Sequence, residues 1–265
     1  TRASFALYNT TDEVERLVGR TLPTAGVDAR GAAERDHIGI FRQKQRGMNY
    51  VGLKVLVGRV KAADLRNIAA LALRYGNGEV RLSPAQAFVI PHISDRLVGE
   101  LAEEPLVKQF AYNPSALYKG LVSCVGSDYC NLAVIETKSR AVETARVLER
   151  KLGDTLKPIT LHWSGCPAGC GNHLVADIGL LGKKAKVGGK VVDAVDVFVS
   201  GRSGPDPKLA IKIMEDVPCD RLPAVLEMVM PYHTREKMHR VRGKAAPKGA
   251  GGSKATASGN ETTGL

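Results

Sequence analysis

The sequence predicts an α+β fold, in which a small unit of strands and one main helix precedes a larger mixed α/β part with a metal site. Two observations lead to this prediction. Between residues 36 and 112, alternating and helical hydrophobic patterns follow one another in the order strand, helix, strand, strand. Beyond them, four cysteines form two close pairs within glycine-containing segments. The chain of 265 residues is long enough for one large or two modest domains.

Residues 1–35 are expected to be a helical lead-in and a linker. An amphipathic helix is predicted at about 12–18, and the proline and glycines of TLPTAGVDARG indicate the linker. The chain does not begin with methionine, and its first residues resemble the end of a preceding helical region. We therefore expect the sequence to be a piece of a longer protein.

Residues 36–112 contain the strand and helix pattern. Apolar residues alternate at Val51, Leu53, Val55 and Val57, which predicts a strand at 49–60. The remaining elements are a helix at 62–75 that ends at the turn Gly76-Asn77-Gly78, strands at 79–82 and 88–93, and a helix near 94–103. This order is typical of half of a ferredoxin-like α+β unit.

Residues 113–233 form the part with the cysteines. Helical spacing of apolar residues predicts one long helix that begins directly after Cys130 and stops at Gly153. A strand at 158–163 leads into the second cysteine pair. Further predicted elements are a β-hairpin of 176–181 with 191–199 around Gly188-Gly189, and helices at about 207–215 and 220–230.

Residues 234–265 are predicted to be a disordered basic tail. They contain almost no large apolar residue after Val241, and seven lysines and arginines stand against two glutamates. The tail therefore contributes much of the formal net charge of +11. Nucleic acid is not an expected partner, because aromatic residues make up 5% and do not alternate with the basic ones. No apolar run approaches the length of a membrane span.

The spacing of the cysteines favours an iron–sulfur cluster over zinc. Cys124 and Cys130 have five residues between them, more than the two to four typical of structural zinc sites, and Cys166 and Cys170 have three. Zinc, a disulfide and redox-active thiols stay open as alternatives. Cys219 is predicted to be a small buried hydrophobe. Thiolate ligands must stay reduced, which predicts a reducing compartment, the cytoplasm.

Three blocks of sequence resemble a known family. They are FRQKQRGMNYVGLKVLVGRV at 41–60, GEVRLSPAQAFVIPHI at 78–93, and the cysteine region, which includes VSCVGSDYCNLAVIETKSRA and LHWSGCPAGCGNHLVADIGLLG. About three quarters of the chain, from 36 to 232, resembles the C-terminal half of the sirohaem-containing nitrite and sulfite reductases. Among these enzymes, the ferredoxin-dependent nitrite reductases are the most similar. The chain departs from the family at Ala168, since the family often has a polar residue between the proline and the second cysteine of the CPxxC segment.

The resemblance implies two cofactors. Cys124, Cys130, Cys166 and Cys170 would bind a 4Fe-4S cluster, and Cys170 would also be the proximal ligand of the sirohaem iron. Ferredoxin would supply six electrons for the reduction of nitrite to ammonia. Sulfite reduction is the alternative within the class, and an electron-transfer subunit without turnover of its own is the alternative outside it.

The resemblance also implies that no catalytic residue lies in this chain. The distal arginines and lysines that bind the substrate come from the first half of the family's fold, so an N-terminal half or a partner chain would complete the active site. Weaker candidates for the sirohaem surroundings are Lys44, Lys138, Arg140 and Asn172. A plain loop is the alternative for Lys44, and solvated helix positions are the favoured alternative for Lys138 and Arg140.

Overall fold

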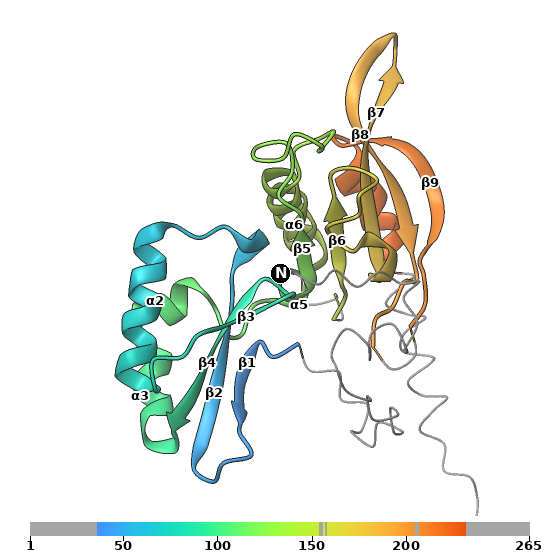
Figure 1. The fold of residues 1–265 in the computed structure, drawn as a ribbon. Helices are drawn as coiled ribbons and strands as arrows, with labels where there is room; N and C mark the ends of the chain where they lie inside the picture. The colour runs from blue at the N-terminus through green and yellow to red at the C-terminus, as the bar shows by residue number, and fades with distance from the viewer. Residues whose placement is uncertain (1–35, 154–155, 157, 205–206, 232–265) are drawn as a thin grey trace, which may run out of the picture. The chain divides into compact units, whose positions relative to one another are not determined.

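The structure is a computed structural model that describes residues 36–153, 156, 158–204 and 207–231. The predictions for the lead-in at 1–35 and for the tail at 234–265 lie outside these residues. The described part contains two β-sheets with helices packed against them (Figure 1), which confirms the predicted α+β class. Each sheet has its own cluster of buried apolar side chains.

The first sheet is antiparallel and has the strand order β1-β2-β4-β3. Its strands are β1 (Gly39–Arg42), β2 (Met48–Lys54), β3 (Arg81–Ser83) and β4 (Ala87–Ser94). The prediction did not include β1, because its four residues show no regular alternation and its register is set by pairing with β2. The predicted strands at 79–82 and 88–93 correspond to β3 and β4.

Three helices pack on this sheet, namely α2 (Ala62–Tyr75), α3 (Val98–Glu103) and α4 (Pro105–Gln109). A short 3-10 turn, η2 (Asp95–Leu97), precedes α3. The predicted helix at 62–75 is confirmed, and so is its end, because the backbone N–H groups of Gly76 and Gly78 both donate to the carbonyl of Ala72. The face of α2 that packs against the strands contains the buried residues Ile68, Leu71 and Tyr75.

The strand predicted at 49–60 is too long. The chain leaves β2 after Lys54 and forms a 3-10 turn, η1 (Leu56–Gly58), in which Val57 has φ 49° and Gly58 has φ 66°. A left-handed conformation ends a strand, and the alternating apolar pattern did not reveal it. Val51, Leu53 and Val55 belong to the core of the first sheet, whereas Val57 belongs to the core of the second.

The second sheet is mixed and has the order β5-β6-β7-β8-β9. Helix α5 (Ala116–Gly120) leads into β5 (Leu121–Ser123), which pairs in parallel with β6 (Leu161–Ser164), and β6 pairs in parallel with β7 (Ile178–Val187). β8 (Lys190–Val199) and β9 (Ile211–Pro218) continue the sheet in antiparallel pairing. The predicted hairpin is confirmed as β7 and β8, and both glycines of its turn, Gly188 and Gly189, have positive φ.

Two predictions in this part are wrong. In the segment predicted as a helix at 207–215, residues 211–215 belong to strand β9 (Ile211–Pro218), because pairing with β8 outweighs the local pattern. The long helix, α6 (Lys138–Leu152), begins well after Cys130, since residues 131–137 make hydrogen bonds to the two cysteine loops instead. Its end at Gly153, with φ 41°, is as predicted. The last predicted helix is confirmed and spans 222–231.

The core of the second sheet joins α6 and the last helix to the strands. Its fully buried members include Trp163, Leu148 and Leu226, from β6, α6 and the last helix. Within the part of the chain that the structure describes, none of the helices is long and apolar enough to cross a membrane.

Candidate metal centre

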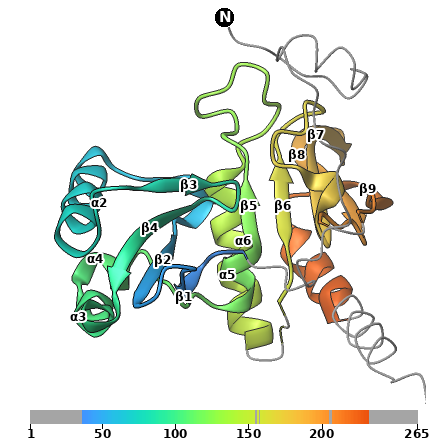
Figure 2. The ribbon, with the colours of Figure 1, turned by 60° about the horizontal axis from the view of Figure 1, so that its bottom comes forward.

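Two neighbouring parallel strands position the two cysteine loops. Cys124 follows directly after β5, and Cys166 comes two residues after the end of β6. Ser123 pairs with Trp163, and the N–H of Cys124 donates to the Trp163 carbonyl at 2.9 Å. Because parallel strands end at the same edge of a sheet, both loops leave that edge together (Figures 1 and 2).

Direct hydrogen bonds join the two loops. The N–H of Val134, in the segment after Cys130, donates to the carbonyl of Gly165 at 2.8 Å. In the opposite direction, the N–H of Gly165 donates to Sγ of Cys124 at 3.1 Å. Backbone amides that donate to ligand sulfurs are one of the means by which proteins tune iron–sulfur clusters. The first loop and the second are therefore fixed against each other at Cys124.

Thr137, at the N-cap of α6, also contacts Cys124. Its Oγ1 donates to the Cys124 carbonyl at 2.9 Å and lies 3.7 Å from the Cys124 sulfur. The positive end of the α6 dipole is thus beside Cys124, whereas the sequence placed it beside Cys130.

Two glycines allow the loops to pack backbone against backbone. A Cβ atom on Gly171 would lie 2.0 Å from the Trp163 carbonyl oxygen. A Cβ atom on Gly126, which has φ 71°, would lie 2.6 Å from Oγ1 of Thr137. Any other residue would push the loops away from the sheet and from the start of α6.

The four cysteines are free thiols on these joined loops. Cys124, Cys130 and Cys166 are half-buried, and Cys170 is exposed. Their chemistry fits a soft metal or cluster, and the Gly165 amide already points at one of the sulfurs. Among the residues that the structure describes, however, no three or more Cys, His, Asp or Glu side chains are arranged around a metal position. The fold brings the loops together without bringing all four sulfurs into a coordination set.

Cys219 is separate from this group, as predicted. It is buried in the core of the second sheet, and its N–H donates to the Asp193 carbonyl. Burial raises the pKa of the Cys219 thiol to about 11. A thiol that stays protonated is a poor metal ligand.

Lys138 lies inside the protein and not on a solvated helix face, so that alternative is wrong for this residue. Its side chain is 7% exposed, and its ammonium donates to the carbonyls of Val57 and Ser123. Burial, followed by the nearby Arg59 charge, lowers the pKa of Lys138. The guanidinium of Arg140 forms an ion pair with Asp193 at 2.8 Å.

The remaining weak candidates lie in two different places. Lys44 is exposed in the turn between β1 and β2, at the opposite end of β2 from Lys54, and the structure does not bring it to the cysteine loops. Asn172 is two residues after Cys170, has φ 55° and exposes its side chain, while its carbonyl lies 3.2 Å from Nδ1 of His162. The roles of these residues toward a sirohaem stay predictions.

Three residues of the first sheet region contact the start of the cysteine part, and the sequence analysis missed all of them. The Gln86 amide exchanges two hydrogen bonds with the backbone of Ser123, the residue before Cys124. Lys54 donates to the Leu121 carbonyl, and Arg59 forms an ion pair with Asp128 between Cys124 and Cys130. A lysine within the apolar run YVGLKVLV was the one available signal; for Gln86 and Arg59 the partners are too distant in sequence for a local pattern to reveal them.

The fold and this site define an α+β protein with a cysteine-rich candidate metal centre at the edge of a mixed sheet. Residues 41–107 match the family model described as Nitrite/Sulfite reductase ferredoxin-like half domain. The chain therefore carries the half domain of the nitrite and sulfite reductases, and the predicted resemblance to them is confirmed.

Individual relatives agree with this assignment. The chain is 44% identical over 217 residues to a ferredoxin–nitrite reductase of Synechococcus elongatus, a match that covers 82% of this chain and 42% of the relative. It is 46% identical over 197 residues to a chloroplastic ferredoxin–nitrite reductase of Oryza sativa, which covers 74% of this chain and 33% of the relative. The solved structure of the Mycobacterium tuberculosis NirA protein superposes with a TM-score of 0.72 at 30% identity, over 82% of this chain and 41% of that one. The chain thus spans less than half the length of these relatives.

Proposed function

We propose that this chain is the metal-ligating part of a ferredoxin-dependent nitrite reductase. Cys124, Cys130, Cys166 and Cys170 bind a 4Fe-4S cluster, and Cys170 also ligates the iron of a sirohaem. The observation that carries the proposal is the parallel pairing of β5 with β6, which places both cysteine loops at one edge of the sheet. Bound there, the two cofactors supply one-electron transfer and an iron at which an oxyanion is reduced.

The chain's own residues prepare Cys124 for ligation. A ligand sulfur must carry negative charge, and two groups beside Cys124 favour such a charge: the Gly165 N–H, which donates to the sulfur, and the N-terminus of α6. Gly171 and Gly126 allow the loop backbones to lie close to the Trp163 carbonyl and to Thr137. The exposed Cys170 lies at the open side, where a second cofactor has access.

The relatives support the choice of donor and substrate. Several are ferredoxin–nitrite reductases by name, from cyanobacteria and plants. We therefore assign ferredoxin as the electron donor, nitrite as the substrate and ammonia as the product, within nitrate assimilation. Sulfite is the alternative substrate, since the matching half domain is shared with sulfite reductases. Free thiols on every cysteine suit a reducing compartment, the cytoplasm.

A complementing segment, on the same polypeptide or on another chain, completes the active site in this proposal. It supplies the cations that bind the anionic substrate on the distal side of the sirohaem. The surface beside Cys130 suits such a neighbour, because Tyr129 and Leu132 expose 82% and 75% of their area around it. Lys44, Arg140 and Asn172 stay candidates for contacts with the sirohaem carboxylates.

The cofactor content of purified protein tests this proposal. A 4Fe-4S cluster contributes about four iron and four acid-labile sulfide per chain, and a sirohaem adds one more iron and an extractable tetrapyrrole. We expect both sets of components after anaerobic expression with sirohaem synthesis. Stoichiometric zinc, or iron without sulfide, would contradict the cluster. A cluster without tetrapyrrole would favour the electron-transfer subunit instead.

A turnover measurement shows whether this chain is an active enzyme by itself or only the metal-ligating part of one. With reduced viologen as donor, we expect the 265-residue chain to produce ammonia only when a first-half domain of a relative is added, because a single preorganised donor is worth about 10²–10³ in rate. Robust ammonia or sulfide production by the chain alone would show that the distal groups lie within it. In that case Lys44 and Arg46 would be the first residues to substitute.

A further inference from the structure

A strained turn of the half domain is held by the cysteine part of the protein. In η1, Val57 has φ 49°, a conformation that is unusual for a β-branched residue and costs energy that contacts with its surroundings must offset. The Val57 side chain is 2% exposed within the core of the second sheet. Its carbonyl accepts a hydrogen bond from the buried ammonium of Lys138 at the start of α6. The turn is therefore fixed from two sides.

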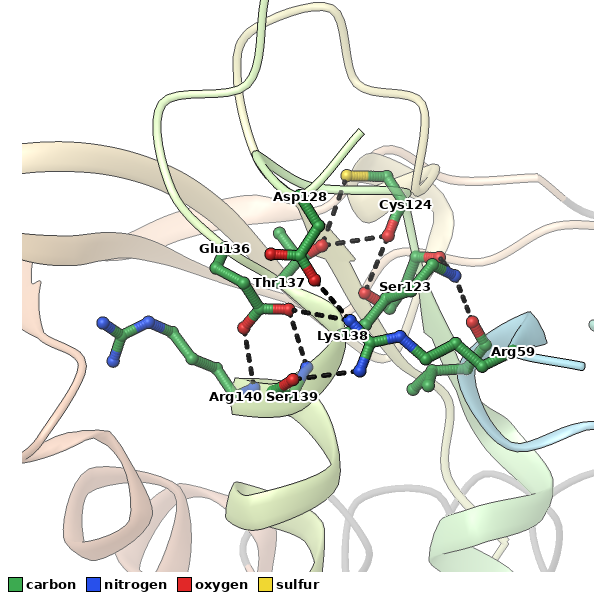
Figure 3. A network of polar contacts seen from close by, with 10 residues as sticks. Arg59, Ser123, Cys124, Asp128, Glu136, Thr137, Lys138, Ser139 and Arg140 are labelled. Carbon is green, nitrogen blue, oxygen red and sulfur yellow. Dashed lines mark hydrogen bonds and ion pairs between the residues drawn. The ribbon is translucent and has the colours of Figure 1, made fainter. Parts of the chain in front are cut away.

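Arg59 follows this turn directly and reaches the first cysteine loop (Figure 3). Its guanidinium lies 2.5 Å from Oδ2 of Asp128 and donates to Oγ of Ser139 at 3.0 Å. The same guanidinium lies 3.6 Å from Oε1 of Glu136. Glu136 in turn accepts the backbone N–H groups of Ser139 and Arg140 and so caps α6.

Asp128 is the one of these partners that lies within the loop of Cys124 and Cys130. It comes four residues after the first cysteine and two before the second. The same loop begins at Ser123, which the Gln86 amide holds through two hydrogen bonds. Gln86 and Arg59 both belong to the half domain. That domain therefore contacts the loop at its start, through Gln86, and at its middle, through Arg59.

We propose that Arg59 is a positioning residue for the metal centre. Through Asp128 it holds the Cys124–Cys130 loop in one position beside the start of α6 before any metal binds. The strained turn at Val57 fixes the direction from which Arg59 reaches the loop. The inference rests on the proposed cluster for its consequence in the loaded protein, but its effect on the loop exists in the metal-free protein as well.

The experiment compares Arg59→Gln and Asp128→Asn with the parent protein in two measurements. In the metal-free, reduced protein, the rate of alkylation by iodoacetamide is followed at each cysteine by mass spectrometry. In the loaded protein, the release of iron to a strong chelator is followed with time. Arg81→Gln is the matched control, because Arg81 also forms an exposed ion pair in the half domain, with Glu79 at 2.6 Å.

We expect both variants to react faster at Cys124 and Cys130, by about three- to tenfold given the usual strength of such networks, and to release iron faster. The rates at Cys166 and Cys170 should change little, and Cys219 should stay unreactive, which a general loss of stability would not produce. Arg59→Lys should give an intermediate rate, since it keeps the charge but loses the planar fork. The double variant Arg59→Asp with Asp128→Arg should restore part of the protection.

Equal rates for Arg59→Gln, Asp128→Asn and Arg81→Gln at the first two cysteines would overturn the inference. An equal increase at all five cysteines would overturn it too, because Arg59 would then be stabilising the fold as a whole. A parent protein that never takes up iron would instead refute the proposed metal centre, and the alkylation measurement would still decide the role of Arg59.

Discussion

The ammonium of Lys54 lies 2.8 Å from the carbonyl oxygen of Leu121, so a side chain at the end of β2 binds the backbone of β5. A second carbonyl, that of Ala85, accepts from the same ammonium at 2.5 Å. Lys54 is 4% exposed. Since β5 is an edge strand of its sheet, its outward carbonyls need partners, and Lys54 and Lys138 provide them at either end of the strand.

Burial of Lys54 predicts a pH dependence of stability. Desolvation, opposed by the nearby Asp36 charge, lowers the pKa of Lys54 from 10.5 to about 8. Above about pH 8 the folded protein has released a proton that the unfolded chain keeps until about pH 10.5, so this residue makes the fold more stable as the pH rises through that window. We expect the free energy of unfolding to rise by about 1.5–2 kcal/mol between about pH 8 and pH 9.5 relative to a variant without the amine.

Urea unfolding of the metal-free protein and of Lys54→Met over that range measures this contribution. Methionine keeps an unbranched apolar side chain of similar length at the site, so the comparison removes the titrating group with little change in volume. Other groups titrate equally in the two proteins and cancel. Parallel stability curves for the two proteins would show that Lys54 keeps its ordinary pKa despite its burial.

The cysteines are expected to divide into four ligands and one structural residue. Serine at Cys124, Cys130, Cys166 or Cys170 should remove most of the bound iron and sulfide, because a hydroxyl is a poor ligand for a cluster. Cys219→Ser should leave both unchanged. In the native metal-free protein, Cys219 should also resist alkylation at neutral pH, since its pKa of about 11 leaves it almost entirely protonated. Iron content that survives any of the four ligand substitutions excludes that residue from the cluster.

Gly171→Ala should separate the second loop from the sheet. The added methyl group would meet the Trp163 carbonyl oxygen at 2.0 Å, so the backbone must move, at a cost of about 1–3 kcal/mol in the free energy of unfolding. Gly99→Ala in α3 is the control, because nothing lies within 4 Å of the new Cβ and alanine favours a helix by about 0.5–1 kcal/mol. Thermal melting of both variants distinguishes the two effects. A melting temperature for Gly171→Ala at or above that of the parent would disprove the close packing.

Gln86→Leu removes both hydrogen bonds to Ser123 while keeping the volume of the side chain. The Ser123 N–H, buried in the edge strand, is then left without its partner, and we expect a loss of about 1–3 kcal/mol in stability. Gln45→Leu is a suitable control. The Gln45 side chain is exposed in the turn after β1, and its amide oxygen accepts a hydrogen bond from the side chain of Gln43. Equal unfolding free energies for the two variants would show that Ser123 finds another partner.

The sequence predicted the elements whose patterns are local. Helix α2, the hairpin of β7 and β8 and the end of α6 at Gly153 all follow from periodicity and turn residues within short windows. Strands β5 and β9 were not predicted. β5 has only three residues, too few to show a pattern, and β9 forms because it pairs with β8. The start of α6 was misplaced for the same reason, since distant hydrogen bonds hold the residues before it.

The candidate site divides in the same way. Cysteine chemistry and spacing identified the four thiols, whereas the residues that hold them did not stand out. Thr137, Gln86 and Arg59 are ordinary polar residues in the sequence, and only their positions in space connect them with Cys124 and its loop. The order in which distant segments meet cannot be read from periodicity.

The parallel pairing of β5 with β6 determines when the two cysteine loops can meet during synthesis of the protein. Such a pair forms only after the chain has been synthesised through α6 and back to the sheet, and contacts between segments far apart in sequence form slowly. During translation, Cys124 and Cys130 are synthesised before the segment that carries Cys166 and Cys170, because 36 positions separate Cys130 from Cys166. Until that segment is synthesised, Cys124 has neither the Gly165 N–H that donates to its sulfur nor the Trp163 carbonyl that accepts its own N–H, so the two joined loops arise only once β6 and the second cysteine pair exist.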